Sequence, residues 1–394
     1  MTAGIFLIIR CSFIFEYAPI TLNFILILGG LTAIFGSTIA CCQNDIKRII
    51  AFSTTSQLGY MFFACGLSGY PIALFHLLNH GFFKALLFLC AGTVIFLMSH
   101  EQDIRKYGRL IVISPFIYSA FLIGNFALMG FPFLSGFYSK EVIIEAAFVT
   151  YNINSYFIYW VSTIAATLTA WYSMRSVFLG FLSHGNWEKV SIQNIPFLKE
   201  SFIFSIWVLI LGSCLAGFIY FPLLIGMGSS FLIESIYIST SNLMIDFEYL
   251  SIFIKNMPLI GSFLGGCAAF SFNFFLFFKL NQISIYQIKS QYIYILFSEC
   301  IYYSLQIRTF LSQKWYLDFL GINYFGFFFL KHGYETYYKL LDKGFLEIFF
   351  FNGFSLTILR LSTKILLQHN GFLYSLFCLN LLCFLFFCFL LFLF

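Results

Sequence analysis

Charged side chains are scarce in this 394-residue sequence: Asp, Glu, Lys and Arg make up 9% of it, whereas 61% is hydrophobic. An ordinary soluble domain carries about 25% charged and about 45–50% apolar residues. This deficit excludes a water-soluble globule. The balance of 21 Lys and Arg against 16 Asp and Glu gives a net charge of +5, which also excludes an acidic tail or a basic surface large enough to bind nucleic acid.

Motifs that hold cofactors or catalytic nucleophiles are missing as well. The 11 cysteines are scattered through apolar stretches, without a C-x-x-C pair or a Cys/His metal-ligand spacing. The sequence has no phosphate-binding glycine loop, nucleophile elbow, haem attachment motif or iron–sulfur cysteine run. We therefore interpret the cysteines as small hydrophobic residues, and we expect any chemistry to move ions or protons rather than electrons or acyl groups.

What the sequence does contain is a series of long apolar stretches. A window of about 19 residues finds them at 21–42, 49–68, 72–98, 111–150, 157–183, 201–226, 256–279 and 371–394. The stretch 111–150 is too long for one helix of about 20 residues, and the segment from Gly130 to Gly136 interrupts it with Pro132. The sequence predicts an all-α, polytopic transmembrane helix bundle with a broken helix and a C-terminal anchoring span.

Basic residues predict the orientation of these spans. Eight cations fall in alternate short loops, provided that 111–150 crosses once: Lys47, Arg48, Arg105, Lys106, Arg109, Arg175, Lys189 and Lys199. Their common face is expected to be the matrix or the cytoplasm. Residues 1–10 are apolar, shorter than a span and unlike a signal peptide, so we expect residues 1–20 to be the end of a truncated span followed by a loop.

The segment before the last apolar stretch has a mixed character. Charged residues of alternating sign recur there at every fourth position: Lys331, Glu335, Lys339, Lys343 and Glu347. This spacing predicts a lateral amphipathic helix with i,i+4 ion pairs, lying along the membrane interface. Gly333, Gly344 and the pair Asn352-Gly353 are expected to break it into pieces. A simple anchoring role and a mechanical role both remain open for this helix.

Three titratable residues lie inside the stretch 72–98, where a charge costs about 2.5–3.5 kcal/mol on insertion scales. His76, His80 and Lys84 recur at i, i+4 and i+8, so they share one helical stripe with about 6 Å of rise between neighbours. Side-chain movement and bridging waters would close such gaps. We interpret the row as a proton path. The alternative is that the histidines only bond to neighbouring helices, while Lys84 extends to an interface.

A charged pair follows the interruption by Gly and Pro. Lys140 and Glu141 lie at the start of the second half-helix, and broken helices at membrane depth line cavities that bind ions. We expect Lys140 to be the partner of the row that ends at Lys84, with Glu141 stabilising its charge. A surface pair at a helix start is the alternative. The polar run from Ser53 to Gln57 is suited to holding water, although a helix-start cap would also explain it.

These residues also carry a resemblance to a known family. Residues 44–61 (NDIKRIIAFSTTSQLGYM) and 75–88 (FHLLNHGFFKALLF) closely resemble the antiporter-like subunits of proton-pumping NADH dehydrogenase. The segments EQDIRK at 101–106 and GFPFLSGFYSK at 130–140 narrow the resemblance to subunit 5 of respiratory complex I. The segments KWYLD at 314–318 and LDKG at 341–344 also fit that subunit. The resemblance covers essentially the whole chain; it is strongest over 44–145 and weak over 184–300.

The resemblance implies an organisation in five parts. They are 1–20, the end of a truncated span plus a loop; 21–183, the second of two inverted antiporter-like helix repeats, with the proton path; 184–280, two accessory transmembrane helices with loops; 281–370, the matrix-side lateral segment; and 371–394, the C-terminal anchor. The central lysine of the family and the histidines that precede it map onto Lys84, His80 and His76. Its exit-side lysine maps onto Lys140.

The function that the resemblance implies is proton translocation by a membrane-arm subunit of NADH:ubiquinone oxidoreductase in the mitochondrial inner membrane. This chain would hold no cofactor, and NADH, FMN, iron–sulfur clusters and ubiquinone would be bound by other subunits. The expected partners are other membrane-arm subunits, membrane lipids and a separate chain that carries the first repeat, with no nucleic acid. A monovalent cation/proton antiporter subunit is the alternative. An inactive structural remnant is disfavoured, because it would have no reason to keep costly intramembrane charges.

Overall fold

The computed structural model describes residues 2–150, 152–185, 200–225, 231–232, 235–237, 249–282, 306–351, 353–368 and 371–393. The described residues form helices and short connections and contain no strand, so the prediction of an all-α fold is confirmed. They divide into two units: unit 1 comprises Met1–Ser312, and unit 2 comprises Gln313–Phe394.

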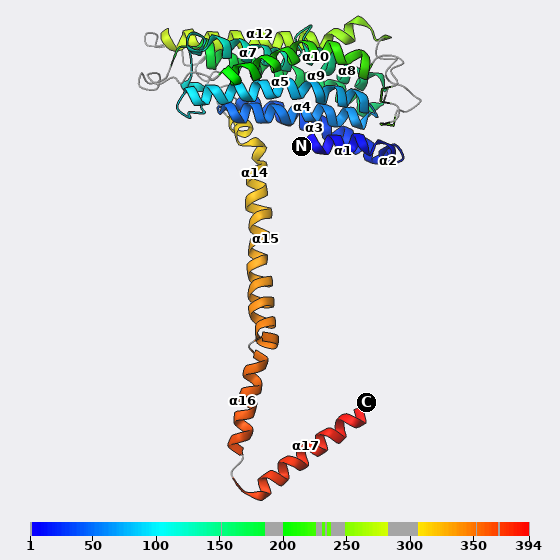
Figure 1. Ribbon diagram of the computed structural model, residues 1–394, viewed down its shortest axis with the longest axis vertical. Coiled ribbons are helices and arrows are strands. Elements are labelled where there is room, and N and C mark those ends of the chain that lie inside the picture. Colours follow the sequence, from blue (N-terminus) through cyan, green and yellow to red (C-terminus); the bar gives the residue numbers. More distant parts are fainter. Residues whose placement is uncertain are drawn as a thin grey trace, which may run out of the picture. The chain divides into compact units, whose positions relative to one another are not determined.

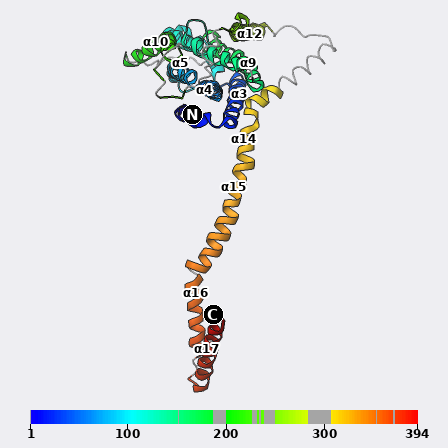
Figure 2. The ribbon, with the colours of Figure 1, turned by 90° about the vertical axis from the view of Figure 1, so that its right-hand side faces the viewer.

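Unit 1 is a bundle of long helices. Its elements are α1 (Thr2–Arg10), α2 (Ser12–Glu16), α3 (Pro19–Cys42), α4 (Ile46–Gly66), α5 (Tyr70–Leu97), η1 (Ile104–Lys106), α6 (Leu110–Ile113), α7 (Pro115–Met129), α8 (Ser135–Val149), α9 (Ile153–Val177), η2 (Phe178–Leu182), α10 (Glu200–Leu224) and α12 (Ile252–Gln282). Figures 1 and 2 show the long helices running alongside one another, with α5 next to α4 and α10. The seven apolar stretches expected between 21 and 279 each coincide with one of these helices, or with the pair α7 and α8.

The stretch 111–150 is broken where the sequence predicts. Helix α7 ends at Met129, Gly130 follows with a φ of +85°, and α8 begins at Ser135. A left-handed φ of this kind favours glycine, because glycine has no Cβ. Gly136 is required for a different reason: a Cβ there would lie 1.7 Å from the carbonyl oxygen of Ala127. The start of α8 is therefore pressed directly against the end of α7.

The loops that carry the predicted basic face meet at one end of unit 1, which we call the basic end (residues 43–46, 98–109 and 178–185). The Ile46 N–H donates to Gln102 O and the Ile104 N–H to Asn44 O, each at 3.0 Å. Arg175 donates to Gln43 O at 2.7 Å. The predicted common face is confirmed for these cations: Lys47, Arg48, Arg105, Lys106, Arg109 and Arg175. Lys189 and Lys199 lie outside the described residues.

Ion pairs order the loop between α5 and α6 at this end. Lys106 Nζ donates to Glu101 Oε2 at 2.7 Å, and this bond lowers the pKa of the Glu101 carboxyl. Arg105 forms a two-pronged pair with Asp103, which lowers the pKa of that carboxyl in the same way. Both carboxylates are therefore ionised at neutral pH, and their ion pairs stabilise the conformation of this loop.

The other end of unit 1, which we call the opposite end, collects the first turns of α3, α5, α9 and α12 and the last turns of α4, α8 and α10. Arg10 of α1 donates to Ser235 O there at 3.3 Å. Pro258 lies inside α12 and has no N–H to offer the carbonyl of Ile254, four residues earlier. The Tyr159 hydroxyl donates to that carbonyl at 3.2 Å, so α9 and α12 are joined at this end.

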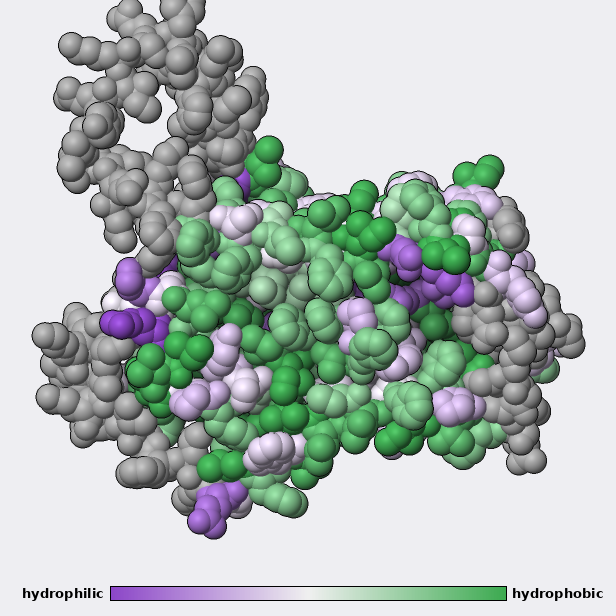
Figure 3. All heavy atoms as spheres, turned by 90° about the horizontal axis from the view of Figure 1, so that it is seen from above, coloured by the Kyte–Doolittle hydropathy of each residue, from purple (hydrophilic) through white to green (hydrophobic). Residues whose placement is uncertain are grey.

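The outer surface of unit 1 is suited to a lipid environment. In the view of Figure 3 it is covered largely by apolar side chains, and large ones such as Phe204 and Trp207 of α10 are exposed. By length and apolar composition, four described helices could cross a membrane: α3, α5, α10 and residues 252–274 of α12. Helices α4 and α9 are 21 and 25 residues long, but they carry runs of polar residues that are mostly buried inside the bundle.

Unit 2 consists of consecutive helical segments. They are η5 (Lys314–Tyr316), α14 (Leu317–Phe319), η6 (Leu320–Gly326), α15 (Phe327–His332), η7 (Gly333–Phe351), α16 (Gly353–Gln368) and α17 (Leu373–Leu393). The expected breaks at Gly333 and Gly344 are wrong, because the backbone stays helical through both, although it changes from α to π winding at Gly333. Asn352 and residues 283–305 of the expected lateral segment lie outside the described residues.

The π winding also changes which side chains meet in unit 2. A π-helix bonds residue i to residue i+5, so neighbours along its surface are no longer spaced as in an α-helix. Lys339 Nζ lies 4.8 Å from the ring centre of Tyr334, and Lys343 Nζ lies 5.3 Å from that of Tyr338. Two of the lysines expected to make i,i+4 ion pairs, Lys339 and Lys343, thus make cation–π contacts at a spacing of five residues.

Close packing of α3 against α4 gives a first prediction. A Cβ at Gly59 of α4 would lie 2.6 Å from the backbone nitrogen of Ala33 and 2.8 Å from the carbonyl oxygen of Gly29. Because these are backbone atoms, Gly59→Ala should force the helices apart and destabilise the protein by about 1–3 kcal/mol. The measurement is the thermal unfolding midpoint of the detergent-solubilised assembly.

Gly92 of α5 supplies the matched control, because a Cβ there would meet no atom within 4 Å. Gly92→Ala should leave the midpoint unchanged or raise it slightly, since alanine is the better helix former. Equal midpoints for the two variants would contradict this account of α3–α4 packing.

Candidate functional site

Helix α5 places the row of titratable residues inside unit 1. His76, His80 and Lys84 have exposed fractions of only 1%, 5% and 4%. The ring centres of the two histidines are 6.1 Å apart. Lys84 lies near the middle of the 28-residue helix, and His76 lies closer to its start at the opposite end. The row therefore runs from the centre of the bundle toward the opposite end.

Lys84 is held by the helix that precedes α5. Its Nζ donates to Ser53 Oγ of α4 at 2.5 Å, and the Ser53 hydroxyl in turn donates to Ile50 O at 2.8 Å. Because the side chain is buried and directed at α4, the alternative in which Lys84 extends to an interface is wrong. The polar run in α4 thus serves as a partner for a buried amine, and it is not merely a helix-start cap.

His76 has a partner on each ring nitrogen. Its Nδ1 lies 2.8 Å from Ser139 Oγ of α8, and its Nε2 lies 3.2 Å from Gln57 Oε1 of α4. The Ser139 hydroxyl also lies within 3.1 Å of Ser135 O. A hydroxyl can donate or accept a hydrogen bond, so this arrangement accommodates both a neutral and a protonated imidazole.

Lys140 is buried at the start of α8, with an exposed fraction of 3%. Its Nζ donates to Thr169 Oγ1 of α9 at 2.8 Å and lies 3.5 Å from Met129 O, a carbonyl at the end of α7. The ring centre of Tyr60 is 5.5 Å away, within cation–π range. The alternative of a surface Lys/Glu pair is therefore wrong for Lys140.

The histidine end of the row, and not Lys84, meets the broken helix. His76 bonds to Ser139, the residue directly before Lys140, while Lys84 bonds to α4. The polar residues thus follow one another in the order Ser53, Lys84, His80, His76, Ser139 and Lys140.

Several buried polar atoms beside this row make no hydrogen bond to any described residue. They are the amide oxygen and nitrogen of Asn79, Nε2 of His80 and Nε2 of Gln57. Buried polar atoms without a partner are rare in native proteins, and ordered water is the usual partner where the protein supplies none. We therefore expect ordered water beside His80. There, between Lys84 and His76, no hydrogen bond joins the described side chains of the row directly.

Two cavities lie next to Lys140 on the side of α12. The smaller, about 10 Å³, is lined by Lys140, Glu141, Pro258 and Ser262, among others, which is room for about one water molecule. The larger, about 330 Å³, is lined by Glu141 and by Glu145, Lys255 and Asn256. No direct ion pair joins Lys140 and Glu141 among the described residues. Glu141 instead lines both cavities.

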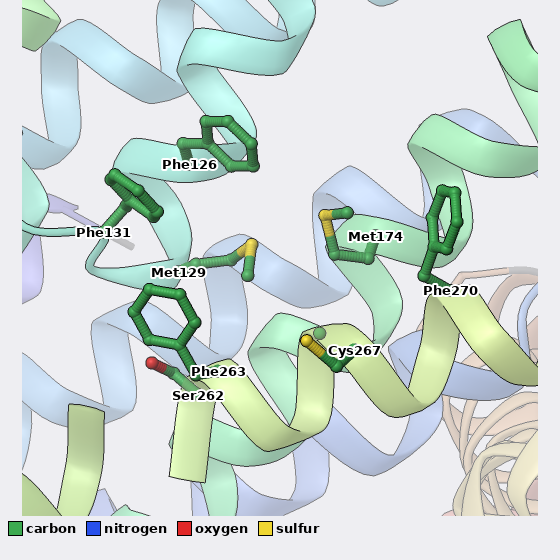
Figure 4. A pocket seen from close by; sticks show the side chains of 9 residues that line it. Phe126, Met129, Phe131, Met174, Ser262, Phe263, Cys267 and Phe270 are labelled. Carbon is green, nitrogen blue, oxygen red and sulfur yellow. The ribbon is translucent and has the colours of Figure 1, made fainter. Parts of the chain in front are cut away.

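A third cavity, about 320 Å³, lies on another side of the break and is apolar. Figure 4 shows side chains from α7, the connection after it, α9 and α12 around it. Its lining is Phe126, Met129, Phe131, Met174, Ser262, Phe263, Gly266, Cys267 and Phe270. Since Ser262 is its only polar side chain, and that hydroxyl donates to Leu259 O, this cavity offers little to a proton or an ion.

Sequence reasoning missed the partners that come from other helices. Ser139, Thr169 and Tyr60 are all buried beside the row, yet the sequence assigned them no role. Serine and threonine in helices commonly bond to a carbonyl of their own helix, so their presence alone predicts nothing. Among the described residues, no group of three or more His, Cys, Asp or Glu could hold a metal ion.

The sequence of this chain is similar to those of several known proteins. Residues 1–169 match a family model described as NADH:quinone oxidoreductase/Mrp antiporter, TM. NADH-ubiquinone oxidoreductase chain 5 of Phytophthora infestans is 45% identical over 95% of this chain and 54% of its own length. The chain 5 proteins of Acanthamoeba castellanii and Marchantia polymorpha are 42% and 40% identical, with the same coverage.

Over most of its length this chain is therefore similar to NADH-ubiquinone oxidoreductase chain 5 proteins. It spans about half the length of the curated relatives it matches. A chain of the Mrp complex from Dietzia sp. DQ12-45-1b has a similar fold, with a TM-score of 0.56 and 21% identity over 77% of this chain and 33% of that one. Together with the apolar helices of unit 1, these relatives identify a multi-pass membrane protein.

The bond between Lys84 and Ser53 gives a second prediction. Ser53→Ala should leave a buried amine without its partner and lower the free energy of unfolding by about 1–3 kcal/mol. Ser37→Ala in α3 is the control, because that buried hydroxyl bonds only within its own helix. The measurement is the thermal unfolding midpoint of the assembly.

The interaction itself is isolated by a double-mutant cycle. Once Lys84→Met has removed the amine, Ser53→Ala should cost much less, since both partners are then gone. The same loss from Ser53→Ala in both backgrounds would show that the bond contributes nothing.

Proposed function

We propose that this chain is a proton-translocating membrane-arm subunit of NADH:ubiquinone oxidoreductase, located in the mitochondrial inner membrane. The observation that carries the proposal is the buried row from Lys84 through His80 and His76 to Ser139 and Lys140. Charged and titratable groups inside a membrane are costly, and they mark ion or proton pathways. The similarity to chain 5 proteins supplies the redox context.

In this proposal His76 is the relay between α5 and α8. A neutral imidazole protonated on Nε2 donates to Gln57 Oε1, while Nδ1 accepts from the Ser139 hydroxyl. A protonated imidazole donates from both nitrogens, and the Ser139 hydroxyl turns to Ser135 O, which lies 3.1 Å away. Because each state keeps both bonds, the proton can arrive and leave without an unpaired buried group. Water beside Asn79 completes the step between Lys84 and His76.

Lys84 and Lys140 are the two stations that hold a proton. Each amine has a hydroxyl partner from a neighbouring helix, Ser53 for Lys84 and Thr169 for Lys140. A hydroxyl can donate to a neutral amine or accept from an ammonium group. The two lysines can therefore gain and lose a proton while their positions stay fixed. Quinone reduction elsewhere in the complex would set the protonation of Lys84.

The cofactors of the reaction belong to other subunits in this proposal. NADH, FMN, iron–sulfur clusters and ubiquinone would be bound by those subunits and would supply the electron transfer that drives the protons. The described residues of this chain offer no cluster of metal ligands. Their contribution is to hold protons at fixed atoms and to exclude water elsewhere.

Unit 1 would then be an antiporter-like repeat. Between Lys84 and the basic end, α5 buries a mainly apolar series: Leu86, Leu87, Cys90, Ala91 and Val94. This part of α5 therefore offers few groups that could carry a proton from the basic end directly to Lys84. A lateral entry from a partner chain fits this arrangement. Other membrane-arm subunits and lipids would cover the exposed apolar surface.

A subunit of a monovalent cation/proton antiporter is the second candidate, because the Mrp complex shares the fold. That structure is 21% identical, however, whereas the chain 5 relatives reach 45%. The similarity therefore favours the NADH-linked function. Sodium-dependent transport without any NADH-oxidising partner would favour the antiporter.

The role of Lys84 gives a third prediction. In the assembled complex, Lys84→Ala should strongly lower the number of protons moved per electron, because the central station of the path is lost. The measurement is acidification or quenching of a pH-sensitive dye in vesicles, recorded with the rate of NADH oxidation.

Lys47→Ala is the matched control, since Lys47 is an exposed lysine at the basic end. It should leave the proton-to-electron ratio unchanged. An unaltered ratio in Lys84→Ala complexes that assemble normally would rule out this role for Lys84.

The partners of this chain give a fourth prediction. After native gel separation of the membranes, mass spectrometry of the band that contains this chain should find NADH dehydrogenase subunits. Migration with cation-transport proteins, and without flavin or iron–sulfur subunits, would support the antiporter instead.

A further inference from the structure

We propose that Glu145 and Lys255 form the outlet of the proton path, in the 330 Å³ cavity that they line between α8, α10 and α12. The proton passes from Lys140 to Glu141, then to Glu145, and then to the aqueous phase at the opposite end of unit 1. This inference rests on the proposed function, and it adds two residues to which the sequence assigned no part in that path.

The proposed outlet is continuous from Lys140 to the larger cavity. Lys140 and Glu141 share the lining of the cavity with room for about one water molecule, and Glu141 also lines the larger cavity. Glu145 follows Glu141 by four residues, so the two carboxylates lie on the same side of α8. A chain of groups able to carry a proton thus leads from the buried amine into the larger cavity.

The outlet also runs in one direction, toward the opposite end of unit 1. Lys140 is near the start of α8, and Glu145 lies one turn closer to its end, which is at the opposite end of unit 1. Lys255 belongs to the first turn of α12, which starts at the same end. Successive members of the path therefore lie progressively closer to this end, the one remote from the basic loops. That is the side on which protons would be released if the basic end faces the matrix.

The two larger cavities differ in the polarity of their linings. The apolar cavity beside Met129 and Phe131 has one polar side chain in its lining, and apolar cavities stay dry. The cavity at Glu145 is lined by three charged side chains and an amide, Glu141, Lys255 and Asn256 among them. Water will enter the second and avoid the first, so a proton leaving Lys140 has a wet route only past Glu141.

Each transfer in this outlet is balanced. The Lys140 ammonium group gives one proton to the water of the smaller cavity and becomes a neutral amine, and the Glu141 carboxylate takes one proton from that water. Glu141 passes the proton to the Glu145 carboxylate, which releases it to water and becomes an anion again. Lys255 is a positioning residue: its positive charge attracts the carboxylate, which favours release.

The proposal gives a fifth prediction. In the assembled complex, Glu145→Gln should lower the proton-to-electron ratio by the same fraction as Lys84→Ala, because a neutral amide cannot take up and release the proton. Glu200→Gln is the matched control, since Glu200 is an exposed glutamate at the basic end of the neighbouring helix α10. It should leave the ratio unchanged.

A second measurement keeps the proposal testable if Glu145→Gln fails to assemble. A membrane-impermeant thiol reagent, applied to one side of sealed vesicles, should modify Lys255→Cys only from the side remote from the basic loops. It should modify Glu200→Cys only from the side of those loops. The modified residue is identified by peptide mass spectrometry, so that native cysteines do not interfere.

The outcomes separate this inference from the proposed function. If Lys84→Ala lowers the ratio and Glu145→Gln does not, or if Lys255→Cys reacts from the basic side or from neither side, the outlet is wrong and the function stands. If neither Lys84→Ala nor Glu145→Gln changes the ratio, the proposed function itself fails. Parallel losses with one-sided labelling of Lys255→Cys support both.

Discussion

The cost of placing an amine in a medium of low dielectric constant shapes this protein more than any other constraint. Lys84 and Lys140 can be buried only because a hydroxyl reaches each of them from another helix, Ser53 from α4 and Thr169 from α9. This requirement explains why α4 and α9 are less apolar than α3 and α10, which meet the exterior with large apolar side chains. The two helices that carry polar residues, α4 and α9, therefore pack beside the buried lysines.

The break between α7 and α8 serves the same constraint. It frees the carbonyl of Met129, which lies 3.5 Å from Lys140 Nζ, and it brings Ser139 within 2.8 Å of His76. Gly136 makes this close approach possible, since any side chain there would collide with Ala127. The break also separates an apolar cavity from a charged one. A single interruption therefore supplies a carbonyl partner for the Lys140 amine. It also brings α8 into contact with the His76 end of the polar row.

Polar groups are distributed unevenly along α5. They accompany the helix from Lys84 toward the opposite end, whereas the part beyond Lys84 packs largely in an apolar cluster. In the proposed function, a proton would therefore reach Lys84 from the side and leave it toward the opposite end.

Hydrophobic periodicity, Pro and Gly act locally, so the sequence predicts the helices, the break between Gly130 and Gly136 and the row His76, His80 and Lys84. It also predicts which loops share the basic end, because spans alternate in direction. The row meets α8 at His76, Thr169 holds Lys140, and Glu145 and Lys255 line one cavity because of how the helices pack in three dimensions. These contacts join residues far apart in the chain, and their side chains would fit many other surroundings. Packing between helices, which no local pattern encodes, selects among those surroundings.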